Sequence, residues 1–237
     1  MWATTMRSGR KHDDRDLDRA SVIVEPDEGP TTTRHDFGHG EVRARRHRNP
    51  DRTLGGWVAE TAHADSEAVV ATDAVVFGNA RVFGPCLILG RARVFDFARV
   101  SGGSVVSDDG EVSESAIVTD GVVAEWAVVA GSARVQGGVV RGTALVTDGA
   151  RVNSGAVVQD RAEVRGLAFV TDGAVVTGDT IVEGAVRGDV IVLDARLDAE
   201  EDVVPADAAA AGPYVAEHVD LLGGDELIEP DEDVSAF

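Results

Sequence analysis

The sequence is short of several residue types that often carry structure or chemistry. Its 237 residues include one cysteine, and aromatic residues make up 5%. One cysteine excludes an internal disulfide and a zinc site built from cysteines. The few aromatics argue against a bulky core, although a hydrophobic content of 43% is sufficient for a real one. Histidine is absent from the whole stretch between Val70 and Asp198.

Long hydrophobic runs are lacking too. No apolar stretch approaches the roughly 18 residues of a membrane span, and the N-terminus is too charged for a signal peptide. We therefore expect no membrane partner. A cytoplasmic location follows, or a virion-associated one if the chain is encoded by a phage.

Positive charge is also scarce. The 22 Lys and Arg residues face 42 Asp and Glu residues, so the formal net charge is −20 and the protein should repel nucleic acid. The exception is the basic stretch 43–52, which could touch RNA or DNA, although a solvated arm is favoured. Residues 1–53 show no sustained period and are predicted to form a disordered polar and basic arm. Residues 198–237 form an acidic C-terminal segment.

A six-residue period fills the region between residues 54 and 197. In each unit a small residue is followed two places later by an aliphatic one, and a Gly or polar residue comes next but one. Alternate side chains of a strand share a face, and Gly or Asp permits the backbone angles of a tight corner. Three units would close a triangular coil with the valines inside. The sequence therefore predicts an all-β parallel β-helix of about seven stacked coils.

The repeat units carry a family resemblance. Residues 78–83 (GNARVF) and 90–95 (GRARVF) resemble the hexapeptide-repeat left-handed parallel β-helix superfamily, in particular bacterial and phage-type members with G-[ND]-A-R-V-[FY] repeats and a Gly-Gly-Trp lead-in. The resemblance covers residues 55–195 or so. It implies threefold self-association and a left-handed coil. Periodicity alone would not give the left hand, because parallel crossovers are normally right-handed. The superfamily includes acyltransferases, γ-class carbonic anhydrases and non-catalytic proteins, so the activity stays open.

Several single residues have structural interpretations. The open end of a solenoid must be covered, and we expect Trp57 to be the N-terminal cap. Cys86 occupies the small-residue position of a unit and is interpreted as a core residue. Phe77 and Phe95 lie one coil apart and are expected to stack. Two five-residue steps, at 118–123 and 135–140, place shortened turns at one corner, interpreted as compensated drift in preference to a functional notch.

The residues just before the inward valines point outward. On the second and third faces this position is mixed, with arginine, glutamate and apolar residues. On the first face it is apolar throughout, and we predict an interface there, with Trp126 as an anchor at the neighbouring corner. The predicted interface residues are Val69, Leu87, Val105, Val122, Trp126, Val139, Val157 and Val175.

Two candidates for the partner that covers this apolar face remain open. A second copy of the chain is favoured, as a homo-oligomer and specifically a trimer. The alternative is the chain's own C-terminal segment, where Val215, Val219 and Leu222 would share one face of a short helix over residues 213–222. That helix is too short to cover all seven aligned positions.

Catalytic chemistry finds little support in the sequence. The acyltransferases of the superfamily need a histidine base and the carbonic anhydrases need three imidazoles on zinc, yet the repeats contain no histidine. Neither a phosphate loop nor a dinucleotide fingerprint is present. We expect no catalytic residue, no metal and no cofactor, and hence a structural or scaffold protein. The alternative is a divergent acyltransferase that takes an acyl-CoA donor at a subunit boundary and uses His63 or His218.

Overall fold

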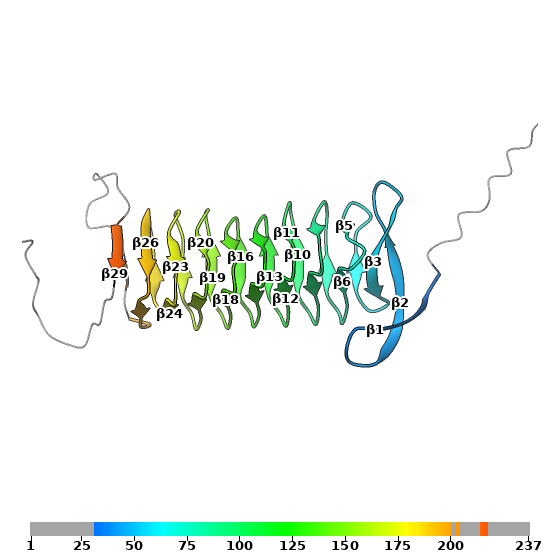
Figure 1. The fold of residues 1–237 in the computed structure, drawn as a ribbon, viewed down its shortest axis with the longest axis horizontal. Coiled ribbons are helices and arrows are strands. Elements are labelled where there is room, and N and C mark those ends of the chain that lie inside the picture. The colour runs from blue at the N-terminus through cyan, green and yellow to red at the C-terminus, as the bar shows by residue number, and fades with distance from the viewer. Residues whose placement is uncertain (1–30, 201, 204–213, 218–237) are drawn as a thin grey trace, which may run out of the picture.

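The protein is described here from a computed structural model that places residues 31–200, 202–203 and 214–217. Every element in this part of the chain is a β-strand, and no described segment forms a helix of the length and apolar character that a membrane crossing requires. The strands wind into a parallel β-solenoid of about eight turns (Figure 1). The all-β stacked-coil prediction is confirmed.

Three sheets run along the solenoid, one on each side of the coil. Sheet A has eleven strands: β1 (Thr33–Asp36), β2 (Glu41–Arg48), β3 (Leu54–Ala59), β6 (Val75–Val76), β9 (Arg93–Val94), β12 (Glu111–Val112), β15 (Val128–Val129), β18 (Leu145–Val146), β21 (Glu163–Val164), β24 (Ile181–Val182) and β27 (Arg196–Leu197).

Sheets B and C have nine strands each. Sheet B consists of β4 (His63–Ala64), β7 (Arg81–Val82), β10 (Arg99–Ser101), β13 (Ile117–Thr119), β16 (Arg134–Gln136), β19 (Arg151–Asn153), β22 (Phe169–Val170), β25 (Ala185–Val186) and β28 (Asp202–Val203). Sheet C consists of β5 (Val69–Val70), β8 (Leu87–Ile88), β11 (Val105–Val106), β14 (Val122–Val123), β17 (Val139–Val140), β20 (Val157–Val158), β23 (Val175–Thr177), β26 (Val190–Leu193) and β29 (Tyr214–Glu217).

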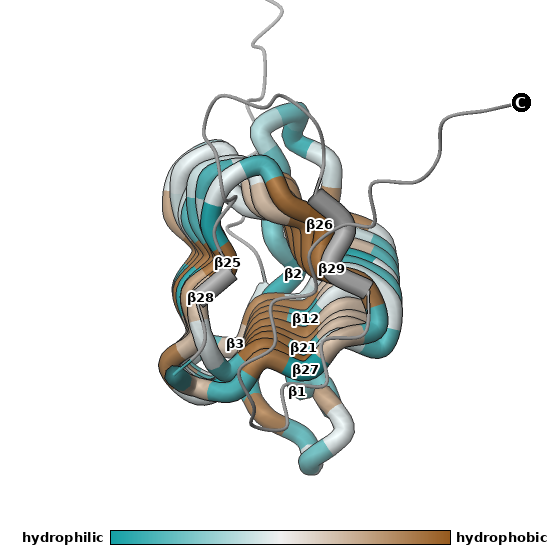
Figure 2. Tube along the Cα trace, turned by 90° about the vertical axis from the view of Figure 1, so that its left-hand side faces the viewer, coloured by the Kyte–Doolittle hydropathy of each residue, from teal (hydrophilic) through white to brown (hydrophobic). Residues whose placement is uncertain are grey.

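The inward positions follow the predicted register. Val129, for example, pairs with Val112 on one side and Val146 on the other, and all three are fully buried. Cys86 is buried among them, and burial raises the pKa of its thiol, as expected of a core residue. Viewed along the axis, apolar residues gather on the flat sides and polar residues at the corners (Figure 2).

The corners use backbone angles that glycine tolerates best. Many corner residues have a positive φ, and where they are not glycine they are mostly Asp or Glu, such as Asp96, Asp108, Glu114 and Glu125. These carboxylates form pairs on consecutive coils, Asp96 with Glu114 and Asp108 with Glu125. The Asp96 carboxylate lies 3.4 Å from the backbone nitrogen of Glu114 and accepts its hydrogen bond, so the pair serves the turn.

The N-terminal end differs from the prediction in two ways. The disordered-arm prediction for residues 1–53 is wrong over β1 and β2, which form an antiparallel hairpin that continues onto β3. The cap is β2 and not Trp57: Ala44 and His47 are buried, whereas Trp57 is partly exposed. A short polar strand can order itself here because the edge of β3 supplies its backbone hydrogen bonds and the first coil supplies the apolar surface.

Aromatic stacking ties this hairpin to the solenoid. Phe37 stacks on Phe77 at 4.9 Å between ring centroids, and Phe77 stacks on Phe95 at 4.8 Å, which confirms the stacking predicted for the latter pair. The basic stretch is also engaged, since the Arg46 guanidinium lies 5.2 Å from the centre of the Trp57 ring. Residues 43–48 therefore belong to the cap and are not a free arm.

The C-terminal end also differs. Residues 214–217 form strand β29, paired in parallel with β26, so the helix expected over 213–222 is not formed at these four residues. The remainder of that segment lies outside the described residues. The solenoid accordingly extends past the boundary at residue 197 and has about eight turns in place of seven.

The cap should make stability depend on pH. A ring nitrogen of His47 lies 2.9 Å from the Ala68 carbonyl oxygen, and burial of the ring lowers the pKa of His47 below its ordinary 6.5. Between the lowered pKa and 6.5 the unfolded chain binds more protons than the folded one, so stability falls as pH drops through that window. We expect the melting temperature to fall from about pH 7 to about pH 5.

The variant His47→Gln isolates this contribution, because glutamine can donate to the same carbonyl but does not titrate in that range. Thermal melts of both proteins across the pH series should show a shallower decline in the variant. Equal slopes would mean that His47 does not contribute to the acid sensitivity.

Candidate functional site

The apolar face predicted from the sequence lies on sheet C. The register joins Val69 to Leu87, Val105, Val122, Val139, Val157 and Val175 in one continuous ladder across neighbouring strands. Ile191 of β26 extends it by one strand. We call these eight side chains the apolar stripe. Seven steps at about 4.8 Å make it about 34 Å long.

Ile191 was missed by the sequence analysis because the six-residue spacing ends after Val182. The alternation of Val190, Ile191 and Val192 was the available signal, since the first and third are buried and the middle one is partly exposed. The stripe therefore reaches further toward the C-terminal end than predicted.

The stripe is exposed to solvent to a limited degree. Leu87 is 36% exposed, and the other members are partly buried by their neighbours in the ladder. Covering the remaining area would stabilise by about 1 kcal/mol or less for each residue. Eight such side chains in one row still amount to several kcal/mol in total, about the scale of a specific contact.

One border of the stripe has glycine in place of a side chain in several coils. At the corner between sheets B and C, the residue two places before the stripe is glycine in four of the eight coils (Gly103, Gly137, Gly155 and Gly173), and it carries a side chain in the other four (Glu67, Pro85, Asp120 and Asp189). The corresponding corner between sheets C and A carries full side chains, including Trp126 and Arg161.

Packing within the chain does not require glycine at these positions. A Cβ placed on Gly155 or Gly173 would meet nothing within 4 Å, although their positive φ favours glycine. At Gly103 the backbone angles are ordinary and the nearest atom to a Cβ is 4.0 Å away. A partner could therefore approach the backbone of sheet C closely at these glycines.

The opposite border is polar over the C-terminal half. Arg141 donates from Nε to Gln159 Oε1 at 3.0 Å, and Gln159 donates from Nε2 to Thr177 Oγ1 at 3.1 Å. Thr177 in turn donates to the carboxylate of Asp160. The apolar stripe thus has a hydrogen-bonded polar rim on one side, the arrangement common in protein interfaces.

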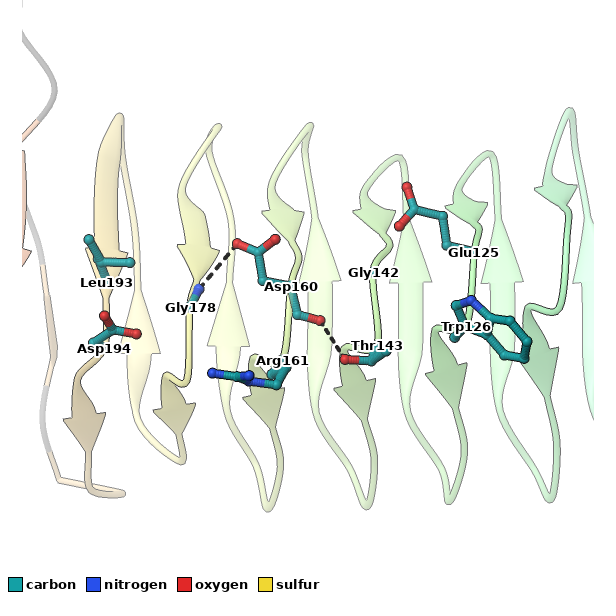
Figure 3. A pocket seen from close by; sticks show the side chains of 9 residues that line it. All are labelled: Glu125, Trp126, Gly142, Thr143, Asp160, Arg161, Gly178, Leu193 and Asp194. Carbon is teal, nitrogen blue, oxygen red and sulfur yellow. Dashed lines mark hydrogen bonds between the residues drawn. The ribbon is translucent and has the colours of Figure 1, made fainter.

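A shallow groove of about 540 Å³ follows the corner between sheets C and A (Figure 3). Trp126 lies at its N-terminal end with 61% of its surface exposed. Its lining residues are Glu125, Trp126, Gly142, Thr143, Asp160, Arg161, Gly178, Leu193 and Asp194. The structure therefore places Trp126 at the corner next to the stripe and not within it.

The groove offers little acid–base chemistry. Hydrogen bonds from the Thr177 hydroxyl and the Gly178 backbone lower the pKa of Asp160, so this carboxylate is ionised at neutral pH and is a weak base. Arg161 is held by Asp179, with Nη2 2.6 Å from Oδ2. Both charged groups are thus engaged in contacts between neighbouring coils.

Of the two histidines considered for an acyltransferase, His63 does not line the groove. His63 lies on β4 of sheet B, where its ring nitrogen is 2.7 Å from the Asp65 carboxylate. His218 lies outside the described residues. Within the described part of the chain, no group of three or more His, Cys, Asp or Glu side chains is arranged to hold a metal ion.

Comparison with known proteins does not add a family to this description. No protein-family model and no curated protein sequence matches the chain. The parallel β-solenoid itself is consistent with a β-helix superfamily.

Proposed function

We propose that this protein is a non-catalytic structural or scaffold component that self-associates through sheet C. The observation that carries the proposal is the apolar stripe, which is aligned strand by strand from Val69 to Ile191. An uninterrupted, partly exposed apolar row of this length favours an interaction site. Its polar rim on one side and the glycines of the corner on the other suit a flat protein partner.

The size of the face supports a second copy as that partner. A stripe about 34 Å long on a side about 15 Å wide offers on the order of 500 Å², which approaches the roughly 800 Å² per partner of a standard interface. Trp126 at the adjacent corner would enlarge the contact area and serve as an aromatic anchor. We favour a trimer.

The C-terminal segment is the less favoured occupant. Residues 214–217 are paired edge to edge with β26, so they extend sheet C and do not lie across its outer side. Val215, one of three residues expected on the covering helix, continues the register of Ile191. The segment left to cover the stripe is accordingly shorter than the sequence analysis assumed.

We also propose, on the basis of the repeat motif, that the chain belongs to the hexapeptide-repeat superfamily. This membership would make the coil left-handed, and a trimer agrees with it. Stacked three-sided coils of short strands, with small and aliphatic residues inside, support this membership.

The test is a pair of lysines in the centre of the stripe. Val122→Lys combined with Val139→Lys places two adjacent charges where the partner would pack, and burying them without counter-charges is costly. We expect the variant to sediment as a monomer while its β-sheet circular dichroism is retained. Light scattering on the intact protein gives the reference mass.

A matched control uses the same coils and the same substitution on another side. Val128 and Leu145 are also outward and partly buried, but they lie on sheet A. Val128→Lys with Leu145→Lys should leave the oligomer intact. An intact oligomer in the sheet C variant, or an equal loss in both variants, would contradict the proposed interface.

A further inference from the structure

Sheet B carries a ladder of arginines that have no counter-charge among the residues that the structure describes. The register aligns Arg81 with Arg99, Ile117, Arg134 and Arg151 on successive strands. Adjacent strands are about 4.8 Å apart, so the charges of Arg81 and Arg99, and of Arg134 and Arg151, repel one another. We call these four the arginine ladder.

Several other arginines of the repeats lie near carboxylates. Arg91 pairs with Asp109, Arg93 lies 3.7 Å from Glu111, and Arg165 contacts Glu163 and Glu183. All four arginines of the ladder are exposed, and none has an ion pair or a side-chain hydrogen bond among the described residues. In a chain with a net charge of −20, this side is a local excess of positive charge.

The same chain contains a segment of opposite charge. Residues 201–237 hold eleven carboxylates and no lysine or arginine. Six of these lie in the sequence DELIEPDED at residues 225–233, where two acids precede Leu227 and Ile228 and further acids follow. The ladder has a matching order, with two arginines on either side of Ile117.

We propose that residues 225–233 bind along the arginine ladder of the same chain. The chain after Glu217 has twenty residues, which span at most about 70 Å when extended. Strand β29 lies three coils from β20, and β20 belongs to the same coil as Arg151. Arg81 is four coils further on, so the distance along the axis from β29 to Arg81 is about 34 Å. The segment is therefore long enough to reach the whole ladder.

Tethering favours this occupant over a free polyanion. A short flexible connection gives an effective concentration in the millimolar range, so ion pairs that are individually weak can act together. A separate polyanion would have to approach a protein of net charge −20. The contact uses sheet B and is independent of self-association through sheet C.

The test exploits the fact that Lys11 is the only lysine in the sequence. Arg134→Lys keeps the charge and adds one amine to the ladder of the full-length protein. Treatment with a carbodiimide joins an amine to a carboxylate that it contacts, and mass spectrometry of the digest identifies the linked peptides. We expect Lys at position 134 to link to an acid within residues 225–233.

The chain should keep its single-chain mass in denaturing electrophoresis, because the link is within one molecule. The linked peptide should decrease several-fold at about 1 M salt, where the Debye length is about 3 Å. Arg93→Lys is the control, since it should link to Glu111 and not to residues 225–233. The proposal is overturned if the control reacts but position 134 does not link to this segment, or if the link is found mainly between two chains.

Discussion

Val129→Asp is expected to abolish soluble expression. Val129 is fully buried and stacks between Val112 and Val146 in the centre of the solenoid. A carboxylate there would have no polar partner in a core of aliphatic side chains, which costs several kcal/mol. This is a large part of the 5–15 kcal/mol that typically holds a domain together.

The matched change at a corner should have little effect. Asp148 is exposed, has a φ of 58°, and accepts a hydrogen bond from the Gly166 backbone at 3.1 Å. Asparagine tolerates the same backbone angles and can accept the same bond, so Asp148→Asn should change the melting temperature little. Soluble yield and thermal melts measure both variants. A normally folded Val129→Asp protein would mean that the inward register is wrong.

Gly56→Ala is expected to have the second largest effect. A Cβ on Gly56 would lie 1.9 Å from the Ala74 carbonyl oxygen and 2.5 Å from that of Ala71. Both are backbone atoms of the neighbouring coil, so strand β3 would have to move away from it. We expect a loss of about 3 kcal/mol or more, because packing and the hydrogen bonds of the first coil would be disrupted together.

Gly103→Ala is the control for this experiment. Its backbone angles are ordinary and its Cβ would have its nearest neighbour at 4.0 Å, so the substitution should be close to neutral. Chemical denaturation of both variants gives the free energies of unfolding. Equal values for the two would show that β3 does not approach the next coil as closely as described.

The core could be predicted from sequence because each coil repeats the same local rule. Small and aliphatic residues alternate, and every step of six returns to the next side of the triangle, so Val69 and Val175 fall on one face without knowledge of distant contacts. The rule stops where the repeat stops. Ile191 was therefore missed, although it belongs to the same ladder.

The ends of the solenoid could not be predicted in this way. Strand β2 is rich in arginine and has no core of its own, and it is ordered through pairing with β3 and burial of Ala44 and His47. Residues 213–222 have a helical pattern of apolar side chains, yet at residues 214–217 the open edge of β26 offers backbone partners that favour a strand. In both cases a tertiary contact outweighs local composition.

The surface was predicted in part. The six-residue period identified an apolar side and two mixed sides. It did not show that Arg81, Arg99, Arg134 and Arg151 lack carboxylate partners among the described residues, nor that several glycines line one border of the stripe. Both features depend on which residues of neighbouring coils come together, and this follows from the register.

Sedimentation equilibrium of the full-length protein tests the central claim most directly. If sheet C is a self-association surface, the mass should correspond to three chains of 24.8 kDa and should fall toward one chain only on dilution. A single chain at all concentrations, with the apolar stripe still accessible to a hydrophobic dye, would contradict it.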